Sequence, residues 1–559
     1  MNVERRVLRA GPLELVFDDG DLRRLRLGDR EVLRRIYVAV RDRNWGTVPG
    51  RIENFALTQG SDSFSIVYDS IHQQNEIDFR WRATIAGNSQ GRIVFAMAGR
   101  AHSTFFRNRI GFCVHHPLKG CAGQPCVVEK ADGRIERGVF PEFVSPHQPF
   151  LDIRSITHPV MPGVEAQVRF TGEVFEMEDH RNWTDANFKT YGTPLALPFP
   201  VEVKAGTEIN QVVDLSIRGN APSARANAEP VRVHLAGARR TKLPALGVCL
   251  SASGGPLTDS TVARLKKLNL SHLRVDVKSE DDWRMAVEAS IRLDVKLEAA
   301  ITLPCDTGYL RANPARVLRW LVFGANERCT SAATLQAARK ALGGAAPLAA
   351  GTNAYFAELN RNRPQGLAID GACFSINPQV HAFFDESLMD NVAAQGDVVR
   401  SAKQFLGGIP VVVSPVTLRP RFNPDATAAS EPPAPDPRQR TQFCAAWTVG
   451  SLKHLSEAGA SSVTYYEAVG ARGLLDERGV FPVYRVLELA AGFAGQDVLP
   501  SESSDAGRVD SIVLASGRRR RTVVANLTGV RQKARVEIGR GHSLELAAYA
   551  VEMIDWTAD

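Results

Sequence analysis

From about residue 245 onward, the sequence alternates short apolar segments with amphipathic ones, and this alternation constrains the fold more than any other feature. Segments of helical periodicity separate nearly all of the apolar ones. The exceptions are a short third helix and the absence of an evident helix between the fifth and sixth strands. Such a pattern is typical of a (β/α)8 barrel. We therefore predict a TIM-barrel catalytic domain over residues 241–497, with eight strands at residues 246–250, 272–277, 295–301, 320–325, 347–352, 367–376, 409–416 and 461–466.

The regions on either side of the barrel have a period of two instead. Residues 1–235 carry many short alternating segments separated by turn residues, and we predict an N-terminal β-sandwich there. Residues 500–559 return to the same pattern and predict a small C-terminal β-sheet domain. A chain of 559 residues is too long for one hydrophobic core, which agrees with a division into domains.

Charge and cysteine content exclude several classes of protein. The net charge of +7 is a mild excess for this length, and the run Arg518–Arg521 reads as a hairpin tip, so we expect no nucleic-acid partner. Neither a secretory signal nor an 18-residue apolar run is present, so we expect no membrane partner. Eight scattered cysteines without a C-x-x-C pair indicate free thiols and a cytoplasmic location. Oligomeric state is left without a prediction.

Polar side chains at the carboxyl ends of the predicted strands are the candidates for chemistry, because active sites of this fold lie there. Carboxylates, a histidine and amides suit a hydroxyl-rich substrate and supply general acids and bases. We nominate Glu467, Glu358 and His381 as catalytic residues. The residues nominated for substrate binding in the barrel are Arg274, Asp276, Asn353, Asn377, Glu327 and Tyr466.

Several nominated residues also have a structural interpretation. Arg274 and Asp276 could form a salt bridge inside the barrel, Glu358 could pair with Arg361, and His381 could be a loop histidine. The Pro-rich segment 423–440 follows the seventh strand on the catalytic face and is either a lid or a flexible insertion.

A second dense group of ionisable and aromatic residues lies in the first domain, around residues 178–189. Ordering so many charged groups beside a β segment is costly, so they either form a salt-bridged turn or reach a ligand. His180 and Arg181 are the two that we nominate for substrate contact.

The pair Asn326–Glu327, at the end of the fourth strand, resembles the acid/base position of a large clan of retaining glycosidases. Such enzymes need a second carboxylate as nucleophile, which that clan places at the end of strand seven. The seventh strand here, VVVSPVTL, has no acid. A glycoside hydrolase therefore stays as an alternative, as does a non-catalytic carbohydrate-binding protein.

Four segments resemble the D-apionate lactonase family: 107–117 (RNRIGFCVHHP), 178–200 (EDHRNWTDANFKTYGTPLALPFP), 375–387 (SINPQVHAFFDES) and 547–556 (AAYAVEMIDW). The resemblance extends over essentially the whole chain. It implies an N-terminal sandwich, a barrel and a C-terminal sheet. It also implies hydrolysis of D-apionolactone, a small sugar-acid lactone, to D-apionate in the catabolism of apiose.

A lactonase needs a polarised carbonyl, an activated water and a proton for the departing ring oxygen. Our hypothesis gives water activation to Glu467 or Glu358, with His381 as the acid/base partner. Asn353, Asn377 and Arg274 would hold substrate hydroxyls or the developing oxyanion, and His180 and Arg181 would close the pocket from the first domain. The chain has no G-x-S-x-G elbow and its barrel no HExxH pattern, so no cofactor is predicted, although carboxylates from separate strands could hold a divalent metal.

Overall fold

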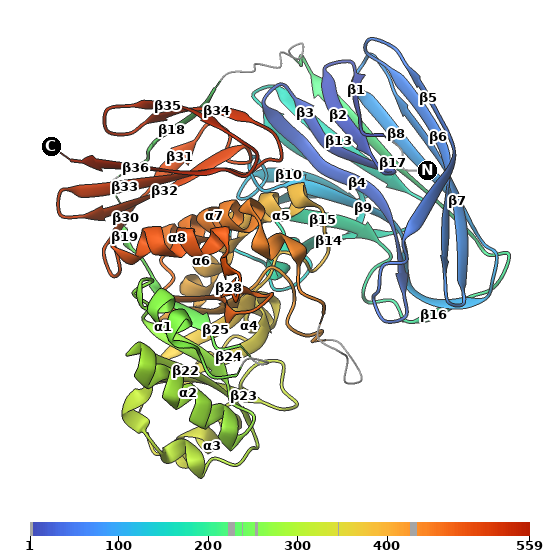
Figure 1. The fold of residues 1–559 in the computed structure, drawn as a ribbon. Helices are drawn as coiled ribbons and strands as arrows, with labels where there is room; N and C mark the ends of the chain where they lie inside the picture. The colour runs from blue at the N-terminus through green and yellow to red at the C-terminus, as the bar shows by residue number, and fades with distance from the viewer. Residues whose placement is uncertain are drawn as a thin grey trace. The chain divides into compact units, whose positions relative to one another are not determined.

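The computed structural model describes residues 4–221, 230–237, 239–251, 255–344, 346–424 and 433–558. These residues form two compact units (Figure 1). Unit 1 comprises residues 1–180 and 187–228. Unit 2 comprises residues 229–559 together with the short segment 181–186, which interrupts unit 1 in the sequence.

Unit 1 is built almost entirely of antiparallel strands, because apolar residues alternate with polar ones along most of its segments. In β2, for example, buried and partly buried positions alternate without interruption. The strands of unit 1 are β1 (Arg6–Ala10), β2 (Leu13–Asp18), β3 (Asp21–Leu27), β4 (Arg30–Asp42), β5 (Gly50–Gln59), β6 (Phe64–Gln74), β7 (Ile77–Gly87), β8 (Arg92–Ala101), β9 (Phe105–Pro117), β10 (Pro125–Lys130), β11 (Ile135–Val139), β12 (Phe150–Met161), β13 (Val164–Thr171), β14 (Phe175–Asp179), β15 (Asn187–Gly192), β16 (Val201–Val203) and β17 (Glu208–Gly219).

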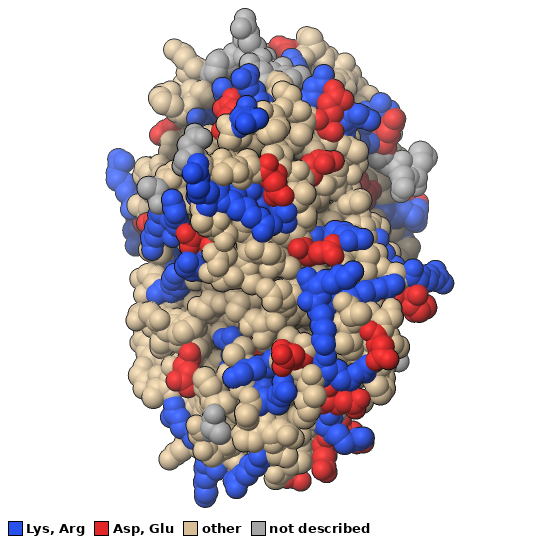
Figure 2. Space-filling view, turned by 60° about the vertical axis from the view of Figure 1, so that its left-hand side comes forward, with Lys and Arg blue, Asp and Glu red and all other residues tan. Residues whose placement is uncertain are grey.

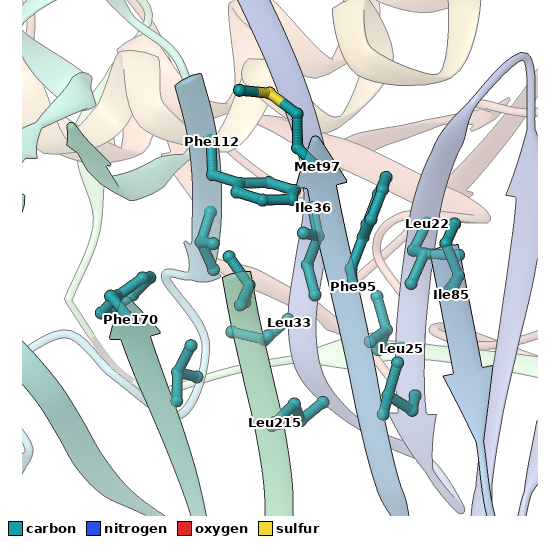
Figure 3. Close-up of a cluster of buried hydrophobic side chains, with 14 of the residues drawn as sticks. Leu22, Leu25, Leu33, Ile36, Ile85, Phe95, Met97, Phe112, Phe170 and Leu215 are labelled. Carbon is teal, nitrogen blue, oxygen red and sulfur yellow. The ribbon is translucent and has the colours of Figure 1, made fainter. Parts of the chain in front are cut away.

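These strands form two layers that share one edge. One layer runs β5-β6-β7-β8-β17-β13-β12-β10-β11, and the other runs β1-β2-β3-β4-β9-β15-β14. Strand β12 pairs with β13 and also with β14, so hydrogen bonding continues from one layer to the other. Figure 3 shows the core between the layers, where Phe95 and Leu215 of the first face Ile36 and Phe112 of the second. This arrangement confirms the predicted sheet-rich N-terminal domain.

Unit 2 contains a closed barrel of eight parallel strands, as predicted. Each strand pairs with the next, and the first pairs with the eighth to close the barrel. The strands are β20 (Ala245–Cys249), β21 (His272–Asp276), β22 (Lys296–Leu303), β23 (Val317–Gly324), β24 (Leu348–Tyr355), β25 (Gly371–Ile376), β26 (Val411–Val416) and β27 (Ser462–Val469). Two short strands extend the sheet beyond β27: β28 (Gly473–Asp476) and β29 (Gly479–Val480).

Helices connect the barrel strands, and local sequence explains where several of them begin. The hydroxyls of Thr258, Ser279 and Ser331 accept backbone N–H groups at three of the helix starts. The α-helices are α1 (Asp259–Lys266), α2 (Glu280–Leu293), α3 (Ala332–Leu342), α4 (Phe356–Arg361), α5 (Asp385–Asp390), α6 (Ala394–Leu406), α7 (Gln442–Ala458) and α8 (Pro482–Ala491). The 3₁₀ turns of this unit are η2 (Tyr309–Arg311), η3 (Pro314–Arg316), η4 (Asn391–Ala393) and η5 (Pro437–Arg440).

Three helical segments differ from the sequence prediction. The expected third helix reduces to η3, because residues from Val317 onward join β23 instead. The connection that seemed to lack a helix contains α4, which has only six residues and therefore little periodicity. Residues 386–408, between the sixth and seventh strands, have the composition of one long helix, but the structure divides this region into α5, η4 and α6.

The C-terminal strands form two small sheets that share one hydrophobic core. Their members are β18 (Val231–Leu235), β19 (Thr241–Lys242), β30 (Asp497–Leu499), β31 (Ser501–Ser503), β32 (Val509–Ser516), β33 (Arg519–Asn526), β34 (Gln532–Glu537), β35 (His542–Leu546) and β36 (Val551–Thr557). Strand β18 pairs with β31 and β34, which differs from the predicted N-terminal domain of residues 1–235. Short alternating strands look alike in both domains, so periodicity alone does not assign β18.

A buried ion pair connects helix α7 of the barrel to the C-terminal sheets. The Lys453 ammonium lies 2.5 Å from a carboxylate oxygen of Asp510 on β32, and both side chains are almost fully buried. Lys453 also donates to the backbone oxygen of Ser501. The C-terminal sheets therefore depend on a charge–charge contact with the barrel as well as on apolar packing.

The surface shown in Figure 2 mixes lysine and arginine with aspartate and glutamate rather than gathering one sign into a large field. None of the helices among the described residues is long and apolar enough to cross a membrane.

Candidate active site

A cavity of about 520 Å³ opens among the carboxyl ends of the barrel strands. Its walls come from the ends of β20, β21, β24 and β27 and from the loops that follow β20 and β26. This is the face on which barrel enzymes carry their active sites. Polar lining residues include Ser251, Asp276, Asn353, Arg421, Glu467 and Arg472. Four of the predicted residues are in the cavity wall: Glu467, Asp276, Asn353 and Tyr466.

Glu467 reaches the cavity because β27 contains a bulge. The hydroxyls of Tyr465 and Tyr466 both bond to helix α7, to Ser451 and Thr448 respectively, so two consecutive side chains point outward. Tyr466 has a φ of 49°, and the pairing of β27 with β20 shifts register at this point. The extra residue re-aims the next side chain, as bulges beside active sites do. Tyr466 therefore positions Glu467, while its own hydroxyl is engaged away from the cavity.

The environment of Glu467 favours proton exchange. Burial raises the pKa of the Glu467 carboxyl above its ordinary value of 4.5, against the opposing effects of Arg472, Ser251 and Arg421. A carboxylate with a raised pKa in a cleft is a stronger base than one in solvent, and its protonated form is a usable acid near neutral pH.

A second carboxylate in the cavity has the opposite character. Asp276 accepts from Arg274 at 2.8 Å through one oxygen and from Arg421 at 3.1 Å through the other. Burial alone would raise the pKa of Asp276, but the two arginines hold it well below the ordinary value. Asn353 joins the same group, since its side-chain oxygen accepts from Arg274 at 2.7 Å and from Arg421. Asp276 is therefore a fixed negative charge rather than a base.

Arg274 is fully buried, so its position is set by the barrel interior. It donates to the backbone oxygen and the hydroxyl of Ser414 at 2.6 and 3.0 Å. Burial would lower the pKa of Arg274, but Asp276 raises it above the ordinary value. The structure shows the salt bridge between Arg274 and Asp276 that was the structural alternative for this pair, with Asp276 in the cavity wall and Arg274 behind it.

A further buried network lies one layer deeper and is structural. Glu298 accepts from Thr464 at 3.0 Å and from Ser414, and its other oxygen lies 3.3 Å from Arg319. His272 donates to or accepts from Thr464 at 2.8 Å. None of these side chains lines the cavity, so they stabilise the barrel interior behind the cavity wall.

Two other predicted carboxylates are engaged elsewhere. Glu327 accepts from the backbone and hydroxyl of Ser331 at 3.0 and 2.6 Å and from the Thr334 hydroxyl at 2.9 Å, all at the start of α3. Burial opposes its ionisation, yet these hydrogen bonds lower the pKa of Glu327 overall. Glu358 lies 3.8 Å from Arg328 and is absent from the cavity wall. The structure therefore gives both residues structural partners, and Arg328 is a partner of Glu358 that the sequence did not suggest.

His381 belongs to a different cluster of unit 2, built around the segment 181–186. Its Nδ1 lies 2.7 Å from an oxygen of Asp185, and its ring packs edge-on against Trp183. The segment is tied down further by Asn391, which bonds to Asp185 and to the backbone of Ala186. His381 is not among the residues that line the 520 Å³ cavity, so the structure does not pair it with Glu467.

The remaining predicted residues also lie outside this cavity. Arg181 is fully buried in unit 2 and lies 3.2 Å from Asp397 of α6, so it is not a residue of the first domain as predicted. His180 belongs to unit 1, where its Nδ1 lies 3.1 Å from the side-chain oxygen of Asn187. Asn377 lines a small cavity of about 10 Å³ that shares Asn353 and Arg421 with the larger one, and its side-chain oxygen accepts the backbone N–H of Gln379.

The Pro-rich segment 423–440 is only partly described, since residues 425–432 lie outside the described residues. At its far end, Asp436 accepts from Gln379 at 2.6 Å and from Arg438 at 2.8 Å. Burial opposes the ionisation of Asp436, but Arg438 and Gln379 lower its pKa to about 2. Pro435, Asp436 and Gln439 line the cavity, so this end is an anchored wall of the site.

Sequence reasoning missed two arginines of the site, Arg421 and Arg472. Each lies in a loop a few residues beyond a barrel strand, β26 and β27 respectively. The signal that could have found them is the same strand-end rule, extended from the last strand residue into the following loop. The cavity also contains Cys249, and burial raises the pKa of its thiol to about 12.

Comparison with known proteins adds independent information. The N-terminal domain model of D-apionate lactonase matches residues 1–220, and the TIM-barrel domain model of the same family matches residues 324–495. The D-apionate lactonase of Brucella anthropi is 30% identical, with 98% of this chain and 96% of that protein covered.

Solved structures are less similar. An endoxylanase of glycoside hydrolase family 30 from Clostridium papyrosolvens is 12% identical with a TM-score of 0.43, covering 59% of this chain and 100% of that one. A family 51 α-L-arabinofuranosidase from Bifidobacterium longum is 11% identical with a TM-score of 0.39, covering 59% of this chain and 98% of that one.

Proposed function

The chain belongs to the D-apionate lactonase family, and we propose that it opens the lactone of D-apionate to the free acid as an enzyme of apiose breakdown. The observation that carries the chemical assignment is the cavity at the barrel mouth. It holds two carboxylates whose pKa values are shifted in opposite directions. The pKa of Glu467 is raised, and that of the arginine-bound Asp276 is lowered. Two carboxylates whose environments push their pKa values apart are a recurrent basis for acid–base catalysis.

Glu467 would serve as the base and then as the acid. It takes a proton from the attacking water while the oxygen of that water bonds to the lactone carbonyl carbon. As the tetrahedral intermediate collapses, the bond between that carbon and the ring oxygen breaks, and Glu467 returns the proton to the departing oxygen. One water is consumed, the catalyst is restored, and the product is a hydroxy acid that ionises at neutral pH.

Arg421 would stabilise the oxyanion of the intermediate. It is partly buried and charged, and it lines the cavity beside Asn353 and Asp276. Fixed positive charge at the developing oxyanion is among the largest single contributions an enzyme makes to such a reaction. Asp276 and Asn353 both hold Arg421 in position and offer acceptors to the substrate hydroxyls.

We further propose that the reaction needs no metal and takes place in the cytoplasm. Two arginines already neutralise Asp276, so this carboxylate has little charge left to offer a cation. All eight cysteines are free, which suits a reducing compartment.

The test is the release of acid from purified protein by a panel of aldonolactones that includes D-apionolactone, followed with a pH indicator, with and without a chelator. We expect turnover of D-apionolactone far above its spontaneous hydrolysis and no loss on chelation. Hydrolysis of aryl glycosides without hydrolysis of any lactone would replace this proposal by the glycosidase alternative. Loss of turnover on chelation, restored by a divalent metal, would overturn the metal-free mechanism alone.

A further inference from the structure

Unit 1 carries two neighbouring arginines on β9, Arg107 and Arg109, that form no carboxylate ion pair within the described part of the chain. Arg109 is only 5% exposed, and its guanidinium donates to two backbone oxygens, of Asn108 at 2.6 Å and Pro194 at 2.9 Å. Its Nε is buried without a hydrogen-bond partner in the described part of the chain, and so is the Nε of Arg107. The two residues flank a shift in the register of β9 with β4, and they are close enough for the charge of Arg107 to lower the pKa of Arg109.

Nearby carboxylates are committed to other groups. Glu173 accepts from the Thr193 hydroxyl at 2.8 Å and from the backbone of Val174. Glu176 accepts from the Tyr191 hydroxyl and from the backbone of Leu195.

Asp42, which lies opposite Arg107 in the register of β4 and β9, accepts backbone N–H groups of its own turn, from Asn44 at 2.8 Å and Gly46 at 2.7 Å. Among the described residues, neither Arg107 nor Arg109 forms an ion pair with a carboxylate. Burial lowers the pKa of both arginines more than Glu173 raises it, so their positive charge is only partly compensated. An anion bound beside such a pair would be stabilised.

Two exposed aromatic side chains lie beside Arg109. Trp45 and Phe199 are 38% and 44% exposed, and their rings pack edge-on with centroids 5.2 Å apart. The Arg109 guanidinium lies over both rings, at 5.0 Å from Phe199 and 5.6 Å from Trp45. Trp45 has a φ of 65°, an unfavourable backbone conformation for tryptophan, and the Asp42 turn holds it there.

We propose that Arg107, Arg109, Trp45 and Phe199 form a second binding site, in unit 1, for a small polyhydroxy carboxylate. The free guanidinium N–H groups match the two oxygens of a carboxylate in geometry and charge. The exposed ring faces offer apolar surface to the C–H face of a carbon chain that bears hydroxyls. The site lies outside the barrel cavity and has no part in the proposed hydrolysis. The choice of an aldonate as the ligand rests on the proposed function, since D-apionate would be its product.

Isothermal titration of the full chain with D-apionate tests the proposal, and titration with inorganic phosphate separates a carboxylate site from a general oxyanion site. We expect Arg109→Gln to weaken aldonate binding at one site at least about tenfold, with lactone turnover unchanged. Arg109→Lys, which keeps the charge but loses the planar fork, should weaken binding less. The matched control is Arg82→Gln, since Arg82 is an exposed arginine of the same unit that already pairs with Asp69 at 3.0 Å.

A second substitution, Arg421→Gln, distinguishes aldonate binding in the barrel cavity from aldonate binding in unit 1. It should remove the first and leave the second intact. If Arg421→Gln abolishes all aldonate binding, the unit 1 site is refuted while the lactonase proposal stands. If no lactone is hydrolysed but Arg109-dependent binding persists, the hydrolysis proposal fails alone. Phosphate binding as tight as aldonate binding would overturn the assignment to a polyhydroxy carboxylate.

Two further outcomes bear on the same site. Should Arg109→Gln fail to fold, Arg107→Gln and Trp45→Leu carry the test, because both side chains are more exposed than Arg109. A change of oligomeric state in Arg109→Gln without any change in aldonate binding would show that the arginines serve an interface between copies, and it would overturn the proposal.

Discussion

Replacing Glu467 by Gln removes the carboxylate to which we assign proton transfer. The glutamine side chain has almost the same size and shape as the glutamate. General acid–base groups contribute roughly 10²–10⁴-fold to rate, equivalent to about 2.7–5.4 kcal/mol of barrier at about 1.36 kcal/mol per tenfold. We expect kcat for D-apionolactone to fall by this factor while the thermal unfolding midpoint stays close to that of the parent. A steady-state pH-indicator assay and a thermal melt on the same preparation measure both quantities.

The matched control is Glu358→Gln, the same substitution at the other carboxylate that the sequence nominated as a base. Its carboxylate lies 3.8 Å from Arg328 and outside the cavity, so kcat should change by less than about threefold. Near-parental turnover in Glu467→Gln would refute the assignment of Glu467. A large loss in Glu358→Gln as well would show that the catalytic centre lies elsewhere than in this cavity.

The pH dependence of the parent gives a second check on Glu467. Burial raises its pKa above 4.5, and a general base loses activity as the pH falls through its pKa. The acidic limb of kcat/KM should therefore lie above the ordinary range of a glutamate, and it should disappear from the residual activity of Glu467→Gln. A limb at or below pH 4 would contradict a raised pKa for the essential base.

Three further substitutions test other parts of the structure. Arg421→Gln should lower kcat/KM at least about tenfold, because the proposed oxyanion site loses a charged hydrogen-bond donor and Asp276 keeps only one arginine. Unchanged kinetics would exclude Arg421 as the group that stabilises the oxyanion. Lys453→Met should lower the free energy of unfolding by about 3 kcal/mol in urea titration, because the buried Asp510 loses its ammonium partner and keeps only His454, 3.3 Å away. A loss below about 1 kcal/mol would mean that the Lys453–Asp510 pair is dispensable. Glu327→Gln should cost only about 1 kcal/mol of stability and leave kcat unchanged, and a large loss of kcat would revive its catalytic interpretation.

The barrel was predictable because its strands are apolar over four or more residues and each is followed by a loop or helix of different periodicity. All eight predicted strand segments overlap β20–β27. The lengths of the helices and strands were harder to predict where local sequence patterns are short or ambiguous. Helix α4 has too few residues to show periodicity, and β18 has the same alternation as the strands of unit 1 although it pairs with β34 at the other end of the chain. Long-range pairing of this kind leaves no local mark on the sequence.

The site was predictable only in part, because the strand-end rule gives a position along the chain and not the direction of a side chain. Asp276 and Asn353 follow the alternation of their strands and were found. Glu358 was nominated by the same reasoning, but it belongs to α4 beyond the end of β24, where the helix turns it away from the cavity.

Glu467 lies in the cavity wall for a reason that the sequence does not show. Thr464 faces the barrel interior, where it bonds to Glu298, so strict alternation along β27 would turn Tyr466 inward and Glu467 outward toward the helices. The left-handed residue Tyr466 adds one position to the strand and reverses this parity. Thr448 and Ser451 of α7 hold both tyrosine hydroxyls on the outer side, so the bulge is stabilised by helix packing. The direction of the Glu467 carboxylate therefore depends on the hydroxyls of Thr448 and Ser451, on a helix that does not line the cavity. Only the folded chain shows this dependence.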